Sequence, residues 1–127
     1  MAKVLVIDDE YGIAELLQAV LEDEEHTVVT APNGRVGLEL LETVAADIIF
    51  LDYMMPIMDG AAVLRWLNAE EPRRNVPVVM MSSIPEDSVA QRCSGYVHFL
   101  RKPFNVFNVL DIVRRLVPLD GFTTSPK

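Results

Sequence analysis

Residues 48–60, IIFLDYMMPIMDG, decide the fold, because an apolar run there ends in a carboxylate. Residues 48–51 are four apolar residues in a row, which is typical of a strand buried on both faces of a sheet. Asp52 follows directly and places a negative charge at the carboxyl end of that strand. We interpret this charge as a nucleophile at the mouth of a phosphate-accepting pocket. The alternative is an ordinary turn residue after a strand.

Short apolar runs alternate with amphipathic segments in the rest of the chain. Four further runs predict strands, over residues 4–7, 27–30, 78–81 and 97–100. Five segments predict helices, over residues 11–25, 34–44, 61–70, 86–94 and 106–117. In the first helix, apolar residues at helical spacing predict the inward face: Ile13, Leu16, Leu17, Val20 and Leu21. The segment over residues 86–94 has the thinnest apolar stripe.

Five strands alternating with five helices imply right-handed crossovers, and hence an α/β fold with a parallel sheet between two layers of helices. Ligands of such sheets bind beyond the carboxyl ends of the strands, where the strand order reverses. Nothing reactive follows the second strand, where Ala31 and Pro32 stand. This suits an edge position and predicts the strand order 2-1-3-4-5.

Polar side chains follow the other four strands, at the edge where a ligand would bind. In chain order these are Asp8, Asp9, Glu10, Asp52, Ser82 and Lys102. Two carboxylates about 4 Å apart repel by roughly 1 kcal/mol in water and more at lower dielectric, so the site needs a cation. Oxygen ligands without His or Cys favour Mg²⁺. Asp52 can attack phosphorus to give an acyl phosphate, with Lys102 as a mobile positive charge and Ser82 as a hydroxyl donor.

Composition limits the class of protein. The 127 residues are 50% hydrophobic, which fits one compact domain. The net charge of −8 argues against nucleic acid as a direct partner. Cys93 is the single cysteine, which excludes an internal disulfide, and no apolar run is long enough for a signal peptide or membrane span, so a cytoplasmic protein is expected. We expect one domain over residues 1–118 and a flexible tail or truncated linker over residues 119–127.

Four motifs together resemble the receiver domain of two-component response regulators. They are DDE at residues 8–10, LDYMMPIMDG at residues 51–60, Ser82, and RKPF at residues 101–104. The resemblance spans residues 3–117 and implies a flavodoxin-like fold. It also implies a signalling switch rather than an enzyme, in which Asp52 accepts a phosphoryl group from a phosphohistidine on a sensor kinase or a phosphotransfer protein.

The same resemblance implies how the site works. Asp9, Asp52 and the Met54 backbone carbonyl would bind Mg²⁺ directly, and Asp8 would bind it through water. Lys102 would contact a phosphoryl oxygen, and the Lys102–Pro103 peptide bond would be cis, as only about 5–6% of X-Pro bonds are.

Two residues are implied to switch. Ser82 would move to bond the phosphoryl group while Phe99 turns inward, which would remodel the face of the fourth helix, fifth strand and fifth helix. That face would bind an effector protein or domain, or a second copy of the chain. The family more often has Thr and Tyr at these two places, and residues 82–102 are about two residues shorter than usual. Apolar Met54 and Ile84 would hinder an incoming water and give a long-lived phosphorylated state.

Other interpretations remain open from the sequence. An enzyme of the haloacid dehalogenase type would need a second Asp at position 54, which is Met, and a flavin-binding carrier would need a phosphate loop where the DDE motif stands. A pseudo-receiver would serve as an interaction module only. Taken singly, Asp8 and Asp9 could cap a helix, Lys102 could be solvated and Phe99 could be core. The chain is either a stand-alone receiver or part of a longer protein.

Overall fold

The computed structural model of the chain describes residues 2–69 and 75–117. Each predicted strand and helix is present in this part of the chain. The elements in order are β1 (Lys3–Ile7), α1 (Tyr11–Asp23), β2 (Thr27–Ala31), α2 (Gly34–Leu40), β3 (Ile48–Asp52), α3 (Gly60–Ala69), β4 (Val78–Ser82), α4 (Glu86–Ala90), β5 (His98–Arg101) and α5 (Val106–Leu116). The predicted tail over residues 119–127 lies outside the described residues.

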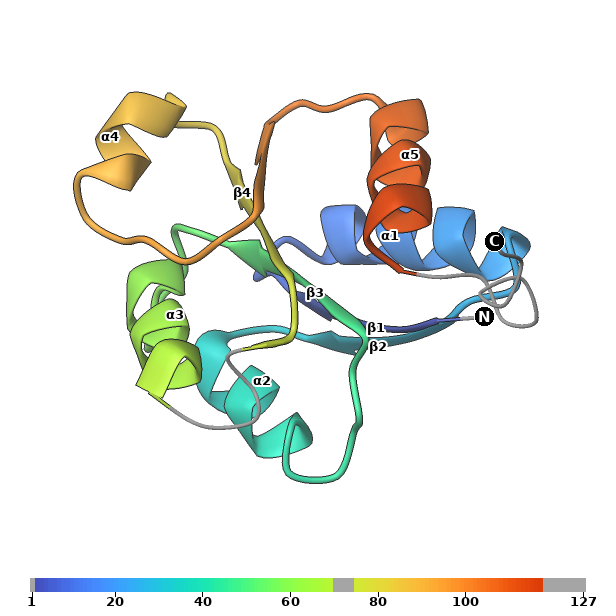
Figure 1. Cartoon of the computed structure of the whole chain (residues 1–127), viewed down its shortest axis with the longest axis horizontal. Helices are drawn as coiled ribbons and strands as arrows, with labels where there is room; N and C mark the ends of the chain where they lie inside the picture. Colours follow the sequence, from blue (N-terminus) through green and yellow to red (C-terminus); the bar gives the residue numbers. More distant parts are fainter. Residues whose placement is uncertain (1, 70–74, 118–127) are drawn as a thin grey trace, which may run out of the picture.

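The sheet is parallel throughout, in the order β2-β1-β3-β4-β5, as predicted. Figure 1 shows α1 and α5 together on one face of the sheet, with α2 and α3 on the other. The central strand β3 is buried along its whole length, including Asp52. The polar ends of the strands therefore meet at one edge of a sheet that is otherwise apolar.

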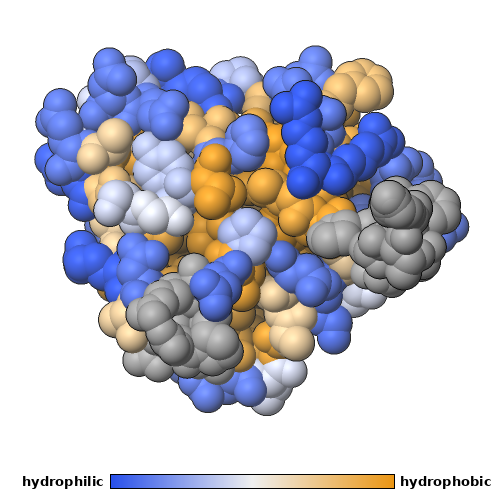
Figure 2. All heavy atoms as spheres, in the orientation of Figure 1, coloured by the Kyte–Doolittle hydropathy of each residue, from blue (hydrophilic) through white to orange (hydrophobic). Residues whose placement is uncertain are grey.

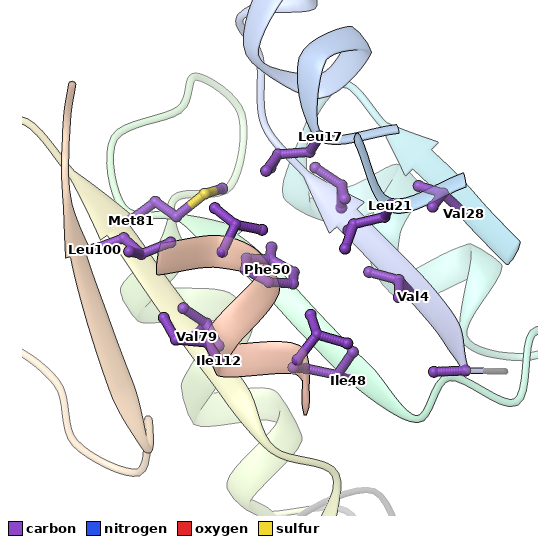
Figure 3. Packing of buried hydrophobic residues seen from close by; sticks show 14 of the residues in the cluster. Val4, Leu17, Leu21, Val28, Ile48, Phe50, Val79, Met81, Leu100 and Ile112 are labelled. Atoms are coloured by element: carbon purple, nitrogen blue, oxygen red, sulfur yellow. The ribbon is translucent and has the colours of Figure 1, made fainter. Parts of the chain in front are cut away.

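Successive residues of each strand point to opposite faces, so the core has two halves. One half packs β-strand residues such as Val6 and Phe50 against Leu17 of α1 and Val109 of α5. Figure 3 shows this half from close by, with the labelled side chains of the strands facing those of the two helices. The other half packs the alternate residues against α2, α3 and α4. Figure 2 shows hydrophobic residues in the middle of one face of the molecule and hydrophilic ones around its margin.

Two helices end four residues earlier than predicted, both in tightened turns, whereas α1 ends two residues early and α5 one. The helix expected over residues 34–44 ends at Leu40, because the Glu42 and Thr43 amides donate to carbonyls three residues back and the Thr43 hydroxyl donates to the Leu40 carbonyl. The helix expected over residues 86–94 ends at Ala90, where the Arg92 amide makes a similar bond to Val89. Gly95, with φ of +105°, then redirects the chain in a conformation that favours glycine.

The predicted inward face of α1 is wrong at one position. Leu16 is 41% exposed, whereas Ala14 is buried together with Leu17 and Leu21. The buried stripe is therefore centred on the spacing i, i+3 and i+7 from Ala14, and Leu16 lies on its edge. In the described part of the chain, no helix is long and apolar enough to cross a membrane.

Candidate functional site

An open pocket of about 480 Å³ lies at the carboxyl ends of β1, β3, β4 and β5. Its lining residues are Asp9, Glu10, Ile13, Asp52, Met54, Ser82, Ser83, Lys102 and Pro103. We call it the acidic pocket. We include in it Asp8, which is buried and does not line the pocket but contacts Lys102. The structure thus brings together the residues that follow four strands scattered along the chain, as a parallel sheet of this order requires.

Lys102 is the centre of the acidic pocket. Its Nζ lies 2.6 Å from Glu10 Oε1, 3.0 Å from Asp8 Oδ2 and 3.4 Å from Asp52 Oδ1. The Lys102 backbone amide also donates to the Ser82 carbonyl at 2.8 Å, which fixes the start of this side chain beside β4. One ammonium group therefore compensates three carboxylates.

The two aspartates beneath Lys102 are almost fully buried, with Asp8 2% and Asp52 4% exposed. Asp8 Oδ1 accepts a hydrogen bond from the Glu10 amide at 2.8 Å. Asp8 Oδ2 is near the ammonium but receives no hydrogen bond from the described residues. In that part of the chain, this buried oxygen is therefore compensated only by an ammonium that it shares with two other carboxylates.

The electrostatics of the acidic pocket favour an added positive charge. Burial first, and the charge of Asp8 second, raise the pKa of Asp52 from 3.8 to about 8, and Lys102 opposes this rise. Burial by itself lowers the pKa of Lys102, but its contacts with Glu10, Asp8 and Asp52 raise it above the ordinary value. Without a cation, Asp52 therefore holds a proton near neutral pH while Lys102 stays charged.

Three carboxylates are close enough to share one cation. Asp8, Glu10 and Asp52 each offer an oxygen, and these atoms lie within 4.8 Å of one another. Asp9 is exposed and lines the same pocket, but it is not in this compact group. The donors are all hard oxygens, without His or Cys, which fits Mg²⁺, and the Asp8 oxygen that, among the described residues, has only the shared ammonium beside it supports that fit.

No role was predicted for Glu10, although the sequence places it at the edge where a ligand would bind. It stands in the acidic run with Asp8 and Asp9, but its neighbour in space is 92 residues away in the chain. The signal that could have found it is its place as the first residue before α1, where short capping side chains are preferred and a Glu is unusual.

Local sequence explains why the loop after β3 folds over Asp52. The Gly60 amide donates to the Tyr53 carbonyl at 2.8 Å, and a Cβ at Gly60 would lie 2.6 Å from the Asp52 carbonyl oxygen. Only glycine permits this approach. Asp59 accepts from the Ala62 amide at 2.9 Å and so caps the start of α3.

Of the two residues expected to switch, Ser82 lines the pocket and Phe99 does not. Ser82 is buried, and its Oγ accepts from the Ile84 amide at 2.9 Å. Phe99 is half-buried and its ring centroid is 6.1 Å from that of Tyr96. The Lys102–Pro103 peptide bond is cis. Met54 is 58% exposed, so its side chain stands at the rim of the pocket.

Comparison with known proteins gives one consistent result. A family model described as the response regulator receiver domain matches residues 4–114. Sporulation initiation phosphotransferase F of Bacillus subtilis is 30% identical over 119 residues, which cover 92% of this chain and 94% of that protein. Two longer relatives, 34% and 32% identical, are matched over 49% and 52% of their own length, so this chain spans about half of them.

Solved structures agree with the sequence matches. Chemotaxis protein CheY4 of Vibrio cholerae is similar with a TM-score of 0.83 and 29% identity, over 92% of this chain and 99% of that one. Response regulator protein TrrA of Thermotoga maritima, solved in complex with Mg²⁺ and BeF, gives a TM-score of 0.82 and 25% identity, over 92% and 100% of the two chains.

Proposed function

Because the chain belongs to the response regulator receiver domain family, we propose that Asp52 accepts a phosphoryl group from a phosphohistidine on a partner protein. The family is a signalling family of two-component systems, and the partner proposed is a sensor histidine kinase or a histidine phosphotransfer protein. The observation that carries the proposal is the buried Asp52 carboxylate 3.4 Å from Lys102 Nζ at the open end of the sheet.

In the proposed step, an ionised Asp52 oxygen attacks phosphorus. An O–P bond forms, the P–N bond to the donor imidazole breaks, and the imidazole leaves with the electron pair. Asp52 must lose its proton first, and its raised pKa opposes this in the metal-free pocket. A positive charge added beside Asp52 would lower that pKa and favour the nucleophilic form.

Receiver domains bind Mg²⁺ at an acidic site, and the donors of this pocket fit that ion. We propose that Asp9, Asp52 and the Met54 carbonyl hold it directly, with Asp8 acting through water. Bound Mg²⁺ would neutralise the carboxylates and the charge on the equatorial phosphoryl oxygens. Because Glu10 belongs to the compact acidic group, it adds to the negative potential that attracts the ion.

Lys102 and Ser82 would stabilise the product from the protein side. The Lys102 ammonium would turn from its carboxylate partners to a phosphoryl oxygen, which it reaches because Asp52 is already 3.4 Å away. The Ser82 hydroxyl would leave the Ile84 amide to donate to another oxygen. Each is a charge-assisted bond, and each replaces a contact that exists before phosphorylation.

We propose that the resulting shift reaches partners through the α4-β5-α5 face. Phe99 supports this, because it is only half-buried in β5, near Tyr96, so it has side-chain surface left to bury on turning inward. This face would dock an effector protein, an effector domain of a longer chain or a second copy. Phe99 lacks a hydroxyl, so the contact it makes there is apolar.

The phosphorylated state is proposed to last many minutes. Met54 and Ile84 are apolar, and Met54 lies at the rim of the pocket, where a hydrolytic water would enter. Loss of the label within seconds from isolated phosphorylated protein would refute this part of the proposal. It would leave the acceptor role of Asp52 untouched.

The deciding experiment is incubation with acetyl phosphate and Mg²⁺, followed by intact-mass measurement. The wild type is expected to gain one phosphoryl group, and Asp52→Asn none. Asp47→Asn is the matched control, because Asp47 is a separate aspartate at the amino end of β3 that accepts from the Lys3 amide. A wild type that gains no mass, or an Asp52→Asn variant that gains it, would overturn the proposed function.

A further inference from the structure

Glu10 stands at the start of α1 without capping it. Its backbone is extended, with φ of −89° and ψ of 105°, and its side chain makes no capping hydrogen bond. Ser, Thr, Asp or Asn at such a position satisfies a free amide of the helix, and a longer Glu is not favoured. The Glu10 carboxylate is instead 2.6 Å from Lys102 Nζ, the shortest contact that this ammonium makes.

The backbone of Glu10 is held on both sides, which directs its side chain. Its amide donates to Asp8 Oδ1 at 2.8 Å, and its carbonyl accepts from the amides of Ile13 and Ala14, both at 3.1 Å. The side chain is 60% exposed, so it lies at the rim of the acidic pocket rather than inside it. Glu10 is therefore a fixed anchor outside the buried pair of aspartates.

We propose that Glu10 is a positioning residue that holds the Lys102 ammonium from the rim of the acidic pocket and competes for it with the phosphoryl group on Asp52. The proposal rests on the proposed function, since it assumes that Asp52 carries the phosphoryl group. It adds a built-in resistance to activation, because Lys102 must leave its shortest contact to bond the new anion.

Charge gives the expected sign. An acyl phosphate brings about two negative charges close to Lys102, and Glu10 adds a like charge a few ångströms away. Replacing Glu10 with Gln removes that repulsion and releases Lys102 toward Asp52. Binding of a phosphoryl mimic should therefore tighten.

Binding of Mg²⁺ alone should change in the opposite direction. Glu10 shares the ammonium with Asp8 and Asp52, which are the groups a cation needs, and its own charge attracts the cation. Without Glu10, Lys102 competes with Mg²⁺ for the buried aspartates. Opposite changes for the two ligands would not arise from a general loosening of the pocket.

The experiment measures both affinities for wild type, Glu10→Gln and Glu22→Gln. Mg²⁺ affinity comes from calorimetric titration, and beryllofluoride affinity from NMR titration at saturating Mg²⁺. Because the Glu10 side chain is largely exposed, solvent weakens its charge interactions, so for Glu10→Gln we expect beryllofluoride to bind about three- to fivefold tighter and Mg²⁺ about threefold weaker. Glu22 is the matched control, because it is an exposed α1 residue bonded to Gln18, and its variant changes the net charge equally.

The outcomes separate this inference from the proposed function. Beryllofluoride binding to Glu10→Gln that is unchanged or weaker, with Glu22→Gln like the wild type, overturns the role of Glu10. A wild type that binds no beryllofluoride overturns the acceptor role of Asp52 instead. Glu10→Asp keeps the charge on a shorter side chain. Its affinity for beryllofluoride should fall between those of the wild type and Glu10→Gln. A Glu10→Asp affinity equal to the wild type would also overturn the proposal, because it would leave only bulk charge as the cause.

Discussion

Two regions of the molecule differ in how deeply their side chains are buried. They are the acidic pocket and the neighbouring segment over residues 86–99, which we call the α4–β5 side. In the pocket, Asp8, Asp52 and Ser82 are almost fully buried. On the α4–β5 side, the five-residue helix α4 buries only Val89, and Val97 is 52% exposed. Groups that perform chemistry need fixed positions, whereas a surface that responds needs few contacts to break. The difference fits the proposed function, in which the acidic pocket performs the reaction and the α4–β5 side transmits the change to partners.

The largest expected effect comes from adding one carbon at Gly60, where the loop that follows Asp52 enters α3. Gly60→Ala would place a Cβ 2.6 Å from the Asp52 carbonyl oxygen and 2.8 Å from the Tyr53 Cα, and both are backbone atoms that cannot move aside cheaply. We expect a loss of about 2–4 kcal/mol in the free energy of unfolding, measured with urea. Gly12→Ala is the control, since nothing lies within 4 Å of its Cβ and alanine favours α1 by up to about 1 kcal/mol. Equal stability of the two variants would show that the loop over Asp52 is not rigid.

The next largest effect tests the ionisation of Asp52 inside the acidic pocket. Burial first, and the charge of Asp8 second, raise the folded-state pKa of Asp52 from 3.8 to about 8. The folded state then binds the proton more tightly than the unfolded chain, so stability falls as pH rises between these values. Asp52→Asn does not lose stability in this way. In metal-free buffer its free energy of unfolding should exceed that of the wild type by about 1–3 kcal/mol near pH 9 and by little near pH 4.

Urea unfolding with a chelator at the two pH values checks this prediction. Adding Mg²⁺ should reduce the difference in free energy of unfolding between the two proteins near pH 9. The cation neutralises the Asp52 carboxylate in the wild type, and the variant lacks this carboxylate. A gap that is the same at both pH values would mean that Asp52 does not titrate in this range.

A third comparison uses one substitution in both regions. Val63 of α3 and Val89 of α4 are both fully buried in the same half of the core. The longer α3 cannot close around a cavity, whereas the single turn of α4 can shift to fill one. We expect Val63→Ala to cost about 2 kcal/mol and Val89→Ala about 1 kcal/mol, by urea unfolding. If Val89→Ala cost as much as Val63→Ala, α4 would be packed as rigidly as α3, and the proposed difference between the two regions would be wrong.

How far the sequence could predict the molecule follows the same division. The strands, their order and the meeting of Asp52 with Lys102 were predictable, because a parallel sheet brings the ends of its strands to one edge. These rules are general and need no knowledge of side-chain packing. They were therefore sufficient for most of the acidic pocket.

What the sequence could not predict depends on single side-chain or turn geometries. The contact of Glu10 with Lys102 requires a rotamer that points away from the helix it precedes. The early end of α4 depends on a tightened turn at Arg92 and on the left-handed Gly95, which outweigh a weak apolar stripe. Leu16 shows a similar limit, because a stripe at helical spacing does not say where its edge lies.

The smallest expected effect comes from the one side-chain hydrogen bond described between α4 and the approach to β5. Tyr96 Oη donates to Glu86 Oε2 at 3.1 Å, and burial followed by this bond raises the pKa of Tyr96 to about 12. Tyr96→Phe keeps the ring that packs near Phe99 but loses the bond, at a cost of about 0.5 kcal/mol. Since the loss is confined to α4, amide exchange at Val89 should quicken about twofold, while exchange in β3 stays unchanged.

Tyr11→Phe is the control for that measurement, because Tyr11 makes a comparable exposed bond to Glu15, at 3.4 Å, in α1. It should leave exchange in α4 unchanged. If Tyr96→Phe instead quickens exchange in β3 as much as in α4, the two regions open as one unit. The α4–β5 side would then be as firmly coupled to the sheet as the acidic pocket, and a movement confined to α4 and β5 would not be available to carry the signal.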